Sequence, residues 1–582
     1  MKLGHFDSPD LDGTSASAKS KLFHSLAAFP KGFWPGLFII VATVAAYWPV
    51  FSAGFIWDDD AYVTNNPLLT APDGLSRIWF SAHTQSQYFP LVFTTLRIEY
   101  GLWGLNPVGY HVVNVCLHII NALLIGALLS RLAVPRAWLV AAVFALHPVQ
   151  VETVAWVTEL KNTESTMFYL LAVFAWLNFC AGKGRSYYAL ALGLQALALF
   201  AKTTACTLPA ALLLVLWLKN EPVNRRRVFQ TVPFLLLGIG MGLVSVWWEN
   251  HLGDYRAQYH LLGGPLDRFL IATHALWFYA AKVFWPGDLI FSYPHWDINA
   301  GEWHQYIWPA GCLAVAGLLW FARRSLGRQP AIALLFFAAA LSPMLGFIPL
   351  YTFYFSYVAD HYQYLACLGL IALGLGLAAK FFETAQAPQR VQAALAALLL
   401  LVLGVATRAQ CHIYQSAEAV WVDTVKKNPR SWMAHTNLGR LLAQRENFSE
   451  AEAHYQAALA IKPDERTVHY NYGNLLARTG RLDESVGQYQ QALQLDPDYA
   501  ETHNNLGFVL NRQHRTDEAI AEYERAISCQ PDYADAYYNL GNALSSEHKM
   551  DAAIAAYQHA LHLEPDSERF RKRLQVLGVL AN

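Results

Sequence analysis

The chain has 582 residues, of which 55% are hydrophobic and 15% charged, and its formal net charge is −1. Soluble domains carry about 25% charged residues, and nucleic-acid-binding proteins carry an excess of positive charge, so this composition argues against an entirely soluble chain and against nucleic acid as a partner. Long apolar stretches fill residues 33–410, whereas residues 411–582 are polar. We therefore expect an all-α protein with a tail (1–32), a polytopic helical membrane domain (33–410) and a soluble domain (411–582).

Eleven apolar segments approach the roughly 20 residues that a helix needs to cross a bilayer. They are 33–53, 108–130, 135–149, 164–181, 187–202, 204–218, 228–249, 306–322, 330–350, 362–380 and 391–407. Lysines and arginines gather in alternate loops, and such loops stay in the cytoplasm. This places the tail in the cytoplasm and puts loops 54–107, 148–163, 250–305 and 350–361, together with the C-terminal domain, on the extracytoplasmic (periplasmic) side of an inner or cell membrane. Segment 266–285 would break the alternation if it crossed, so we expect it to lie along the outer membrane surface.

The first expected external loop begins with GFIWDDDAYVTNNP (54–67), which carries Asp58, Asp59 and Asp60 next to an apolar segment. The loop runs for about fifty residues, which is long for a simple connection. Helix capping and solvation would also explain three consecutive carboxylates. Polar residues in the neighbouring segments favour a functional interpretation instead.

The next apolar segment carries His111, Asn114, His118 and Asn121 on one helical face, either as functional groups or as helix–helix hydrogen bonds. Further polar residues follow in HPVQVETVAWVTELKN (147–162), FAKTTACTLP and YVADHYQYLACLGL (357–370): His147, Glu152, Glu159, Lys161, Lys202, Asp360, His361, Tyr362 and Tyr364. We expect these groups to form one site at the outer membrane surface. A lipid-linked substrate would keep its tail in the bilayer, cations would neutralise its phosphate, and a carboxylate would deprotonate an incoming hydroxyl. That chemistry fits glycosyl transfer from a polyprenyl-phosphate sugar.

The C-terminal domain repeats every 34 residues. Four kinds of residue mark the step: prolines at 429, 463, 497, 531 and 565, glycines at 439, 473, 507 and 541, tyrosines at 455, 489, 523 and 557, and alanines at 458, 492, 526 and 560. This is the period and pattern of tetratricopeptide repeats, which are helical hairpins stacked into a solenoid. We expect a half-repeat near 416–429, four full repeats, and a cap helix over 567–580.

One asparagine recurs at the same position of each full repeat, at Asn437, Asn471, Asn505 and Asn539. An amide both donates and accepts, which suits the backbone of an extended peptide in the concave groove. This arrangement resembles the asparagine ladder of the nucleocytoplasmic O-linked N-acetylglucosamine transferase. Hydrogen bonds within the repeats are the alternative. We expect these asparagines to bind a peptide or protein acceptor.

From about residue 50 to the C-terminus, the chain resembles the transmembrane and tetratricopeptide-repeat-containing proteins. The resemblance rests on the joint order of FIWDDDAYVTNNP, GLNPVGYHVVNVCLHIINALL, HPVQVETVAWVTELKN, LFAKTTACTLP, YVADHYQYLACLGL and the repeats. It implies a membrane domain like that of C-type glycosyltransferases (GT-C). Eukaryotic members of the family are linked to O-mannosylation of cadherins, and this chain looks like a bacterial relative.

The resemblance also implies roles for individual residues. Asp58 or Asp59 would be the general base, with Asp60 accessory. Lys161 and Lys202 match basic positions that would contact the donor phosphate. Glu152 would orient the acceptor or a metal, and Glu159, His111 and His147 would assist. Relatives commonly have arginine where this chain has His361, so His361 would contact the donor phosphate with less constant charge. A divalent metal (Mg or Mn) stays possible, and no metal ligand is assigned.

We therefore expect a polyprenyl-phosphate-dependent protein O-glycosyltransferase of inverting type that transfers a hexose such as mannose to an acceptor held by the repeats. One alternative is a non-catalytic scaffold anchored in the membrane for an envelope assembly. Another is a transferase that acts on lipid or glycan. Convergence of the candidate residues on one pocket would distinguish an enzyme from a scaffold.

Overall fold

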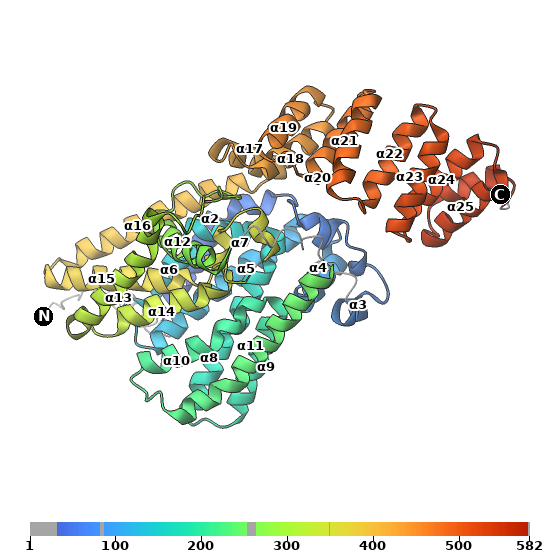
Figure 1. The fold of residues 1–582 in the computed structure, drawn as a ribbon. Helices are drawn as coiled ribbons and strands as arrows, with labels where there is room; N and C mark the ends of the chain where they lie inside the picture. Colours follow the sequence, from blue (N-terminus) through green and yellow to red (C-terminus); the bar gives the residue numbers. More distant parts are fainter. Residues whose placement is uncertain (1–31, 82–86, 253–262, 349, 580–582) are drawn as a thin grey trace, which may run out of the picture. The chain divides into compact units, whose positions relative to one another are not determined.

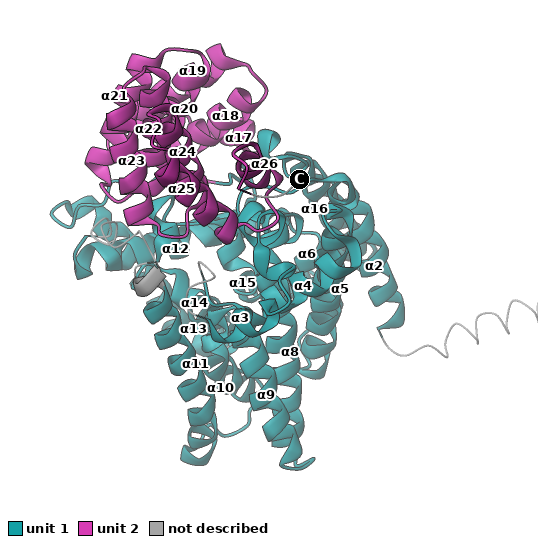
Figure 2. Ribbon diagram, turned by 90° about the vertical axis from the view of Figure 1, so that its right-hand side faces the viewer, with its two compact units in different colours: residues 1–291, 295–419 teal, residues 292–294, 420–582 magenta. Residues whose placement is uncertain are grey.

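The computed structural model describes residues 32–81, 87–252, 263–348 and 350–579; the expected tail lies outside them except for Gly32. Every regular element in this part of the chain is helical, which confirms the all-α prediction (Figure 1). The chain divides into two compact units (Figure 2). Unit 1 comprises Met1–Phe291 with His295–Ala419, and unit 2 comprises Ser292–Pro294 with Val420–Asn582. The sequence placed the corresponding boundary at 411.

Unit 1 contains a helix for each of the eleven apolar segments. These are α2 (Phe33–Ala46), α5 (Pro107–Arg131), α6 (Ala137–Ala145), α8 (Leu160–Cys180), α9 (Ser186–Ala201), α10 (Leu208–Leu218), α11 (Arg225–Leu252), α13 (Ile307–Leu326), α14 (Gln329–Leu341), α15 (Cys367–Thr384) and α16 (Gln389–Ile413). Neighbouring helices pack in pairs such as α5 with α8, α8 with α9, and α14 with α15.

Length and composition divide these helices into two groups, apart from α8, which has 21 residues and belongs to neither. Among the described residues, five are long and apolar enough to cross a membrane: α5, α11, α15 and α16, and α13 together with the short helix η8 (Trp303–Tyr306). The pair of α6 with the helix that follows would make a sixth. Helices α2, α9, α10 and α14 are apolar but shorter, and prolines such as Pro49 and Pro343 follow two of them closely. The eleven apolar segments therefore do not give eleven full-length helices among the described residues, and proline, which cannot continue a helix, explains the ends of two of them.

Segment 148–163 was expected as an external loop, but it is buried throughout. The chain bends by 55° after α6 and continues through η4 (Pro148–Gln150), α7 (Val151–Ala155) and η5 (Val157–Glu159) into α8. Pro148 ends the helical run, and valines between the polar residues bury the segment. The polar motif therefore lies inside the helical unit.

Loop 54–107 is also folded. It forms η2 (Asp60–Thr64), η3 (Pro67–Leu69), α3 (Gly74–Phe80) and α4 (Pro90–Trp103). Tyr62, Leu68 and Phe93 from this loop share an apolar core with Val157 and Leu160 of the buried motif. The acidic loop is thus fixed to the segment that carries the other polar candidates. Segment 266–285 forms α12 (Pro265–Phe284), and its position at the membrane surface stays a prediction.

Unit 2 is a tetratricopeptide solenoid. Helix α17 (Ala417–Lys427), which begins in the last residues of unit 1, forms the half-repeat, and α26 (Glu568–Val576) is the cap. Between them lie four hairpins: α18 (Trp432–Gln444) with α19 (Phe448–Ile461), α20 (Arg466–Arg478) with α21 (Leu482–Leu495), α22 (Ala500–Arg512) with α23 (Thr516–Cys529), and α24 (Ala534–Ser546) with α25 (Met550–Leu563). The described helices of unit 2 thus form four hairpins between α17 and α26.

The repeated glycines are needed because two helices approach closely. A Cβ atom added to Gly473 would lie 2.6 Å from the ring of Tyr489, and one added to Gly541 would lie 2.6 Å from Tyr557. Both tyrosine side chains are fully buried. The glycine of the first helix therefore makes room for the tyrosine of the second, as the sequence pattern indicated.

Candidate active site

The three aspartates of the acidic loop have different environments. Asp59 is buried, and its carboxylate accepts hydrogen bonds from the backbone N–H of Ile56 (2.8 Å), the backbone N–H of Thr158 (2.9 Å) and the Thr158 hydroxyl. Asp60 is exposed at the start of η2 and accepts from the Thr64 hydroxyl. Asp59 therefore connects the acidic loop to the buried motif, and Asp60 faces solvent.

Asp58 is half-buried, and within the described residues its carboxylate accepts no hydrogen bond from another side chain or N–H group. Burial raises its pKa to about 6, although the ammonium of Lys161 acts in the opposite direction. A carboxylate with unused lone pairs and a pKa near the working pH suits a general base. The preceding Trp57 has a φ of 42°, an uncommon conformation for a residue with a side chain and one typical of functional sites.

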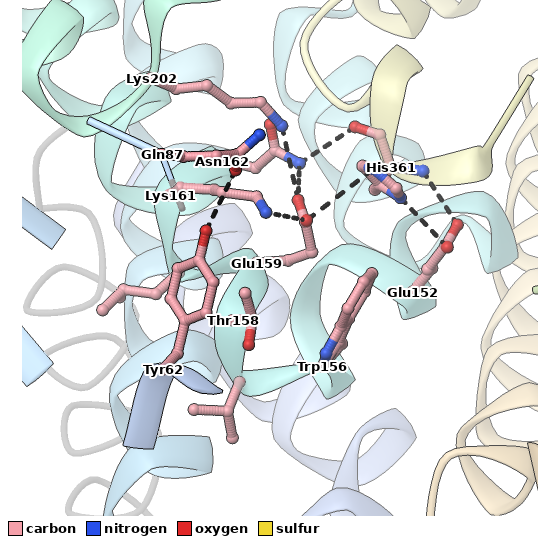
Figure 3. Close-up of polar contacts among 12 residues, drawn as sticks. Tyr62, Gln87, Glu152, Trp156, Thr158, Glu159, Lys161, Asn162, Lys202 and His361 are labelled. Carbon is pink, nitrogen blue, oxygen red and sulfur yellow. Dashed lines mark hydrogen bonds and ion pairs between the residues drawn. The ribbon is translucent and has the colours of Figure 1, made fainter. Parts of the chain in front are cut away.

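Glu159 is the centre of a charged cluster (Figure 3). Its carboxylate lies 2.9 Å from the Lys161 Nζ, 3.5 Å from the Lys202 Nζ and 3.8 Å from the His361 Nε2, and it also accepts from the Asn162 amide. Burial acts to raise the pKa of Glu159. The nearby basic side chains of His361, Lys161 and Lys202 have the larger effect, and they hold the pKa well below its usual range.

His361 connects this cluster to the second buried carboxylate. Its Nδ1 lies 3.1 Å from Glu152, and its backbone N–H donates to the same carboxylate at 3.0 Å (Figure 3). Asn162 donates to the His361 carbonyl at 3.1 Å. Glu152 therefore holds the backbone of His361 and lies beside its imidazole. The predicted trio of Lys161, Lys202 and His361 is brought together around Glu159.

The same three bases line one cavity of about 170 Å³. Its other walls include the apolar residues Val246, Trp248, Met344, Ile348 and Leu350. These residues come from α11 and from the segment that follows α14. The cavity thus has a basic part and an apolar part, which suits a ligand with an anionic head and a hydrocarbon tail.

The polar face of α5 proves to be mainly structural. Asn114 donates to the Trp156 carbonyl, His118 bonds to the Ala145 carbonyl at 3.0 Å and to the Tyr364 hydroxyl at 2.8 Å, and Asn121 donates to the Thr163 carbonyl at 2.8 Å. These bonds hold the buried motif and the 361–364 segment against α5. Of the two interpretations left open for this face, helix–helix bonding accounts for these three residues.

The two other histidines also lie apart from the cluster. His111 is buried beside the backbone of Ala53 and Gly54. His147 donates from Nε2 to the Val283 carbonyl at 2.9 Å and accepts at Nδ1 from the Val149 N–H. No contact given for the described residues joins either ring to Glu159 or Asp58. His147 thus joins the buried motif to α12 (Pro265–Phe284), and acceptor binding by His111 and His147 stays a prediction.

The repeat asparagines use their amide donors inside unit 2. Asn437 donates to the Met433 carbonyl at 3.0 Å, Asn505 to the Asn474 amide oxygen at 2.9 Å, and Asn539 to the Asn504 amide oxygen at 2.9 Å. The bonds of Asn505 and Asn539 join consecutive repeats. All four asparagines, including Asn471, stay half-exposed, and peptide binding by them stays a prediction.

The cluster does not fit a divalent metal. Among the described residues, no group of three or more His, Cys, Asp or Glu side chains is placed to hold one ion. Glu159 and Glu152 are already directed at lysine and histidine nitrogens.

Two contributing residues were not singled out by sequence reasoning. Thr158 holds Asp59, and Asn162 joins Glu159 to the His361 backbone. Both lie within the motif 147–162, so the signal was present. Both side chains are neutral, so the sequence offered no reason to choose them. Their partners, Asp59 and His361, lie about 100 and 200 residues away in the sequence, and only the fold brings them together.

Comparisons with known proteins cover both units. A family model described as TPR repeat matches residues 473–514 and 510–546, and models described as Tetratricopeptide repeat match residues 414–466 and 534–567. The solved structure of YrrB, described as a TPR protein with an unusual peptide-binding site, matches 27% of this chain and 82% of its own length at 20% identity and a TM-score of 0.25.

Curated relatives share one kind of name. Human Protein O-mannosyl-transferase TMTC4 is 32% identical over 173 residues, or 25% of this chain and 23% of that protein. Mouse TMTC2 is 29% identical over 154 residues (25% and 18%), and Drosophila melanogaster Tmtc1 is 26% identical over 306 residues (47% and 35%). Over the matched part, the chain is similar to these proteins. The matched part spans between 18% and 35% of these relatives.

Proposed function

We propose that the chain is a membrane protein O-mannosyltransferase that takes its sugar from a polyprenyl-phosphate donor. One observation carries the proposal: Lys161, Lys202 and His361 line one cavity whose remaining walls are largely apolar. The name that the relatives share, Protein O-mannosyl-transferase, supports the kind of reaction. The alternation of basic loops supports an extracytoplasmic site in a cell membrane.

The donor would lie in this cavity with its phosphate at the basic part and its first isoprene units along Trp248, Met344 and Ile348. An ammonium has three donors, and one contact to Glu159 leaves each lysine with others for phosphate oxygens. When the bond between the sugar C1 and the phosphate oxygen breaks, its electron pair stays on the phosphate. The bases stabilise that added charge in a partly water-excluded site.

Asp58 would take the proton of the acceptor. As the serine or threonine oxygen of the acceptor bonds to C1 from the opposite face, its proton passes to the Asp58 carboxylate, and the configuration at C1 inverts. Asp58 suits this role better than Asp59, because three hydrogen bonds already use the Asp59 carboxylate. Asp59 instead fixes the loop that carries the base, through Thr158.

Unit 2 would recruit the protein acceptor. Stacked helical hairpins form a concave surface suited to extended peptides, and the half-exposed asparagines supply both donors and acceptors along it. Their bonds between repeats do not exhaust the amide groups, since each amide has two N–H groups and one oxygen with two lone pairs.

The test is an activity measurement on purified full-length protein, with labelled polyprenyl-phosphate mannose and a serine- and threonine-rich peptide. The double variant Lys161→Gln/Lys202→Gln should raise the KM for the donor and lower kcat. Lys183→Gln, which changes an exposed lysine, should behave as the unchanged protein. No transfer by the unchanged protein with any mannosyl donor, or equal transfer by all three proteins, would refute the proposal.

A further inference from the structure

A second cavity in unit 1 lies apart from the candidate active site. It has a volume of about 730 Å³ and is lined by residues of α5, α8, α10, α14 and α15 and of the loops at their ends. Residues such as Leu129, Val173, Leu214, Phe336 and Leu373 make its walls apolar. It shares no lining residue with the cavity of Lys161 and Lys202, so it needs an explanation of its own.

Four cations from four different elements line this cavity: Arg131, Lys219, Arg328 and Lys380. They lie at the C-terminal end of α5, directly after α10, directly before α14, and in the last turns of α15. No aspartate or glutamate stands among the described residues that line the cavity. The charge of the lining is therefore positive, while its walls are apolar.

Three of these cations have neutral partners. Arg131 donates to the Asn178 side-chain oxygen at 2.8 Å, Arg328 to the Leu218 carbonyl at 3.4 Å, and Lys380 to the Ser325 carbonyl at 2.8 Å. Lys219 alone has a carboxylate partner, Glu221, at 2.6 Å. Among the described contacts, three positive charges thus remain without a compensating anion.

An apolar cavity does not hold ordered water, and a cavity between membrane helices is open to hydrocarbon chains instead. Uncompensated cations at one end of it attract an anion. Basic pockets between membrane helices on the cytoplasmic side are a known arrangement for anionic lipid headgroups, and all four cations belong to loops or helix ends that the charge pattern assigns to the cytoplasm.

We propose that this cavity binds one anionic glycerophospholipid from the inner leaflet. Its acyl chains lie along the apolar walls, and its phosphate contacts Arg131, Arg328 and Lys380. A zwitterionic lipid fits less well, because its own cation would face the same positive charges. The inference does not depend on the proposed function, since the lipid is a bound component and takes no part in transfer.

Native mass spectrometry of the full-length protein in detergent measures this binding directly. The probes are dioleoyl-phosphatidylglycerol, dioleoyl-phosphatidylcholine with the same chains, a polyprenyl phosphate, and inorganic phosphate as a headgroup without chains. We expect one tightly bound phosphatidylglycerol. Equal binding of the two lipids would overturn the assignment. So would binding of phosphate alone with the affinity of the lipid, or tighter binding of a polyprenyl phosphate that competes for the cavity.

Two pairs of variants separate the headgroup from the chains. Arg131→Gln/Arg328→Gln should weaken phosphatidylglycerol binding about 30-fold, at about fivefold for each cation near the membrane surface. The exposed pair Arg225→Gln/Arg226→Gln makes the same charge change outside the cavity and should have little effect.

Gly376→Leu fills the cavity from α15, where an added Cβ meets nothing within 4 Å. It should reduce lipid binding by at least tenfold, whereas Gly193→Leu, at an equally open position outside the cavity, should not. If the arginine variant fails to fold, the leucine variant still decides the question. Unchanged binding in Gly376→Leu would overturn the proposed position of the chains.

Discussion

The assignment of Asp58 as the base makes a quantitative prediction for Asp58→Asn. An amide of nearly the same shape keeps the volume of the side chain and cannot accept the proton of the acceptor. Removal of a general base costs about 100- to 10,000-fold in rate, so kcat should fall by that factor with little change in the KM for either substrate. In the unchanged protein, kcat/KM should fall about tenfold for each pH unit below about 6, where the Asp58 carboxylate becomes protonated.

The same carboxylate has a predictable effect on stability. Its pKa is raised from 3.8 in the exposed state to about 6 in the folded chain, chiefly by burial, so ionisation is less favourable in the folded than in the unfolded state. The protonated Asp58 carboxyl therefore increases the free energy of unfolding below about pH 4. This contribution is lost as the pH rises through about 6. At about 1.4 kcal/mol for each pH unit, the loss amounts to about 3 kcal/mol.

Asp58→Asn should therefore be less active and more stable than the unchanged protein above pH 6. Thermal unfolding in detergent, followed by circular dichroism between pH 4 and pH 8, measures the second effect. Asp60→Asn is the matched control, because the Asp60 side chain is exposed. Retained transfer in Asp58→Asn, or a melting difference from the unchanged protein that does not grow between pH 4 and pH 6, would refute the reasoning.

Three further predictions test the cluster and the repeats. Glu159→Gln leaves two buried ammonium groups without their carboxylate and should destabilise the protein by about 3–5 kcal/mol, whereas Glu568→Gln at an exposed ion pair should cost less than about 1 kcal/mol; chemical denaturation measures both. His361→Arg should lower the KM for the donor about tenfold at pH 8, since a guanidinium stays charged and binds phosphate bidentately; an unchanged KM in the transfer assay would exclude a phosphate contact at this position. Gly473→Ala should destabilise unit 2 by about 1–3 kcal/mol, because its Cβ would meet a tyrosine ring at 2.6 Å, whereas Gly487→Ala, in open space, should not; thermal melting of residues 420–582 compares the two.

The repeats could be predicted in detail because their determinants are local. A glycine, a tyrosine and an alanine at fixed spacing specify the same hairpin each time, so the period alone gave the helices and their number. The membrane unit was harder to predict. Hydropathy located all eleven apolar helices, but it could not show that 148–163 turns inward, because the polar residues of that segment are satisfied by partners far away in sequence.

In the candidate site, too, some features follow from local sequence and others from contacts between distant segments. The types of residue and their motifs were sufficient to choose Asp58, Lys161, Lys202 and His361, since each is an ionisable residue at the edge of an apolar segment. Their roles relative to one another depend on contacts between distant segments. Sequence could not distinguish Asp58 from Asp59, because the difference arises from the hydrogen bonds that Thr158 donates.

Those hydrogen bonds also connect the two halves of the proposed chemistry. Thr158 donates a hydrogen bond to Asp59, and Glu159 is the residue that follows Thr158 in the chain. One stretch of backbone therefore fixes both the loop of Asp58, the proposed general base, and the Glu159 carboxylate. The basic side chains proposed to bind the phosphate surround that carboxylate. A catalytic arrangement needs its base and its leaving-group contacts held at a constant separation. Burial of this polar segment inside the apolar helices, at the cost of desolvating its charges, supplies that constant separation.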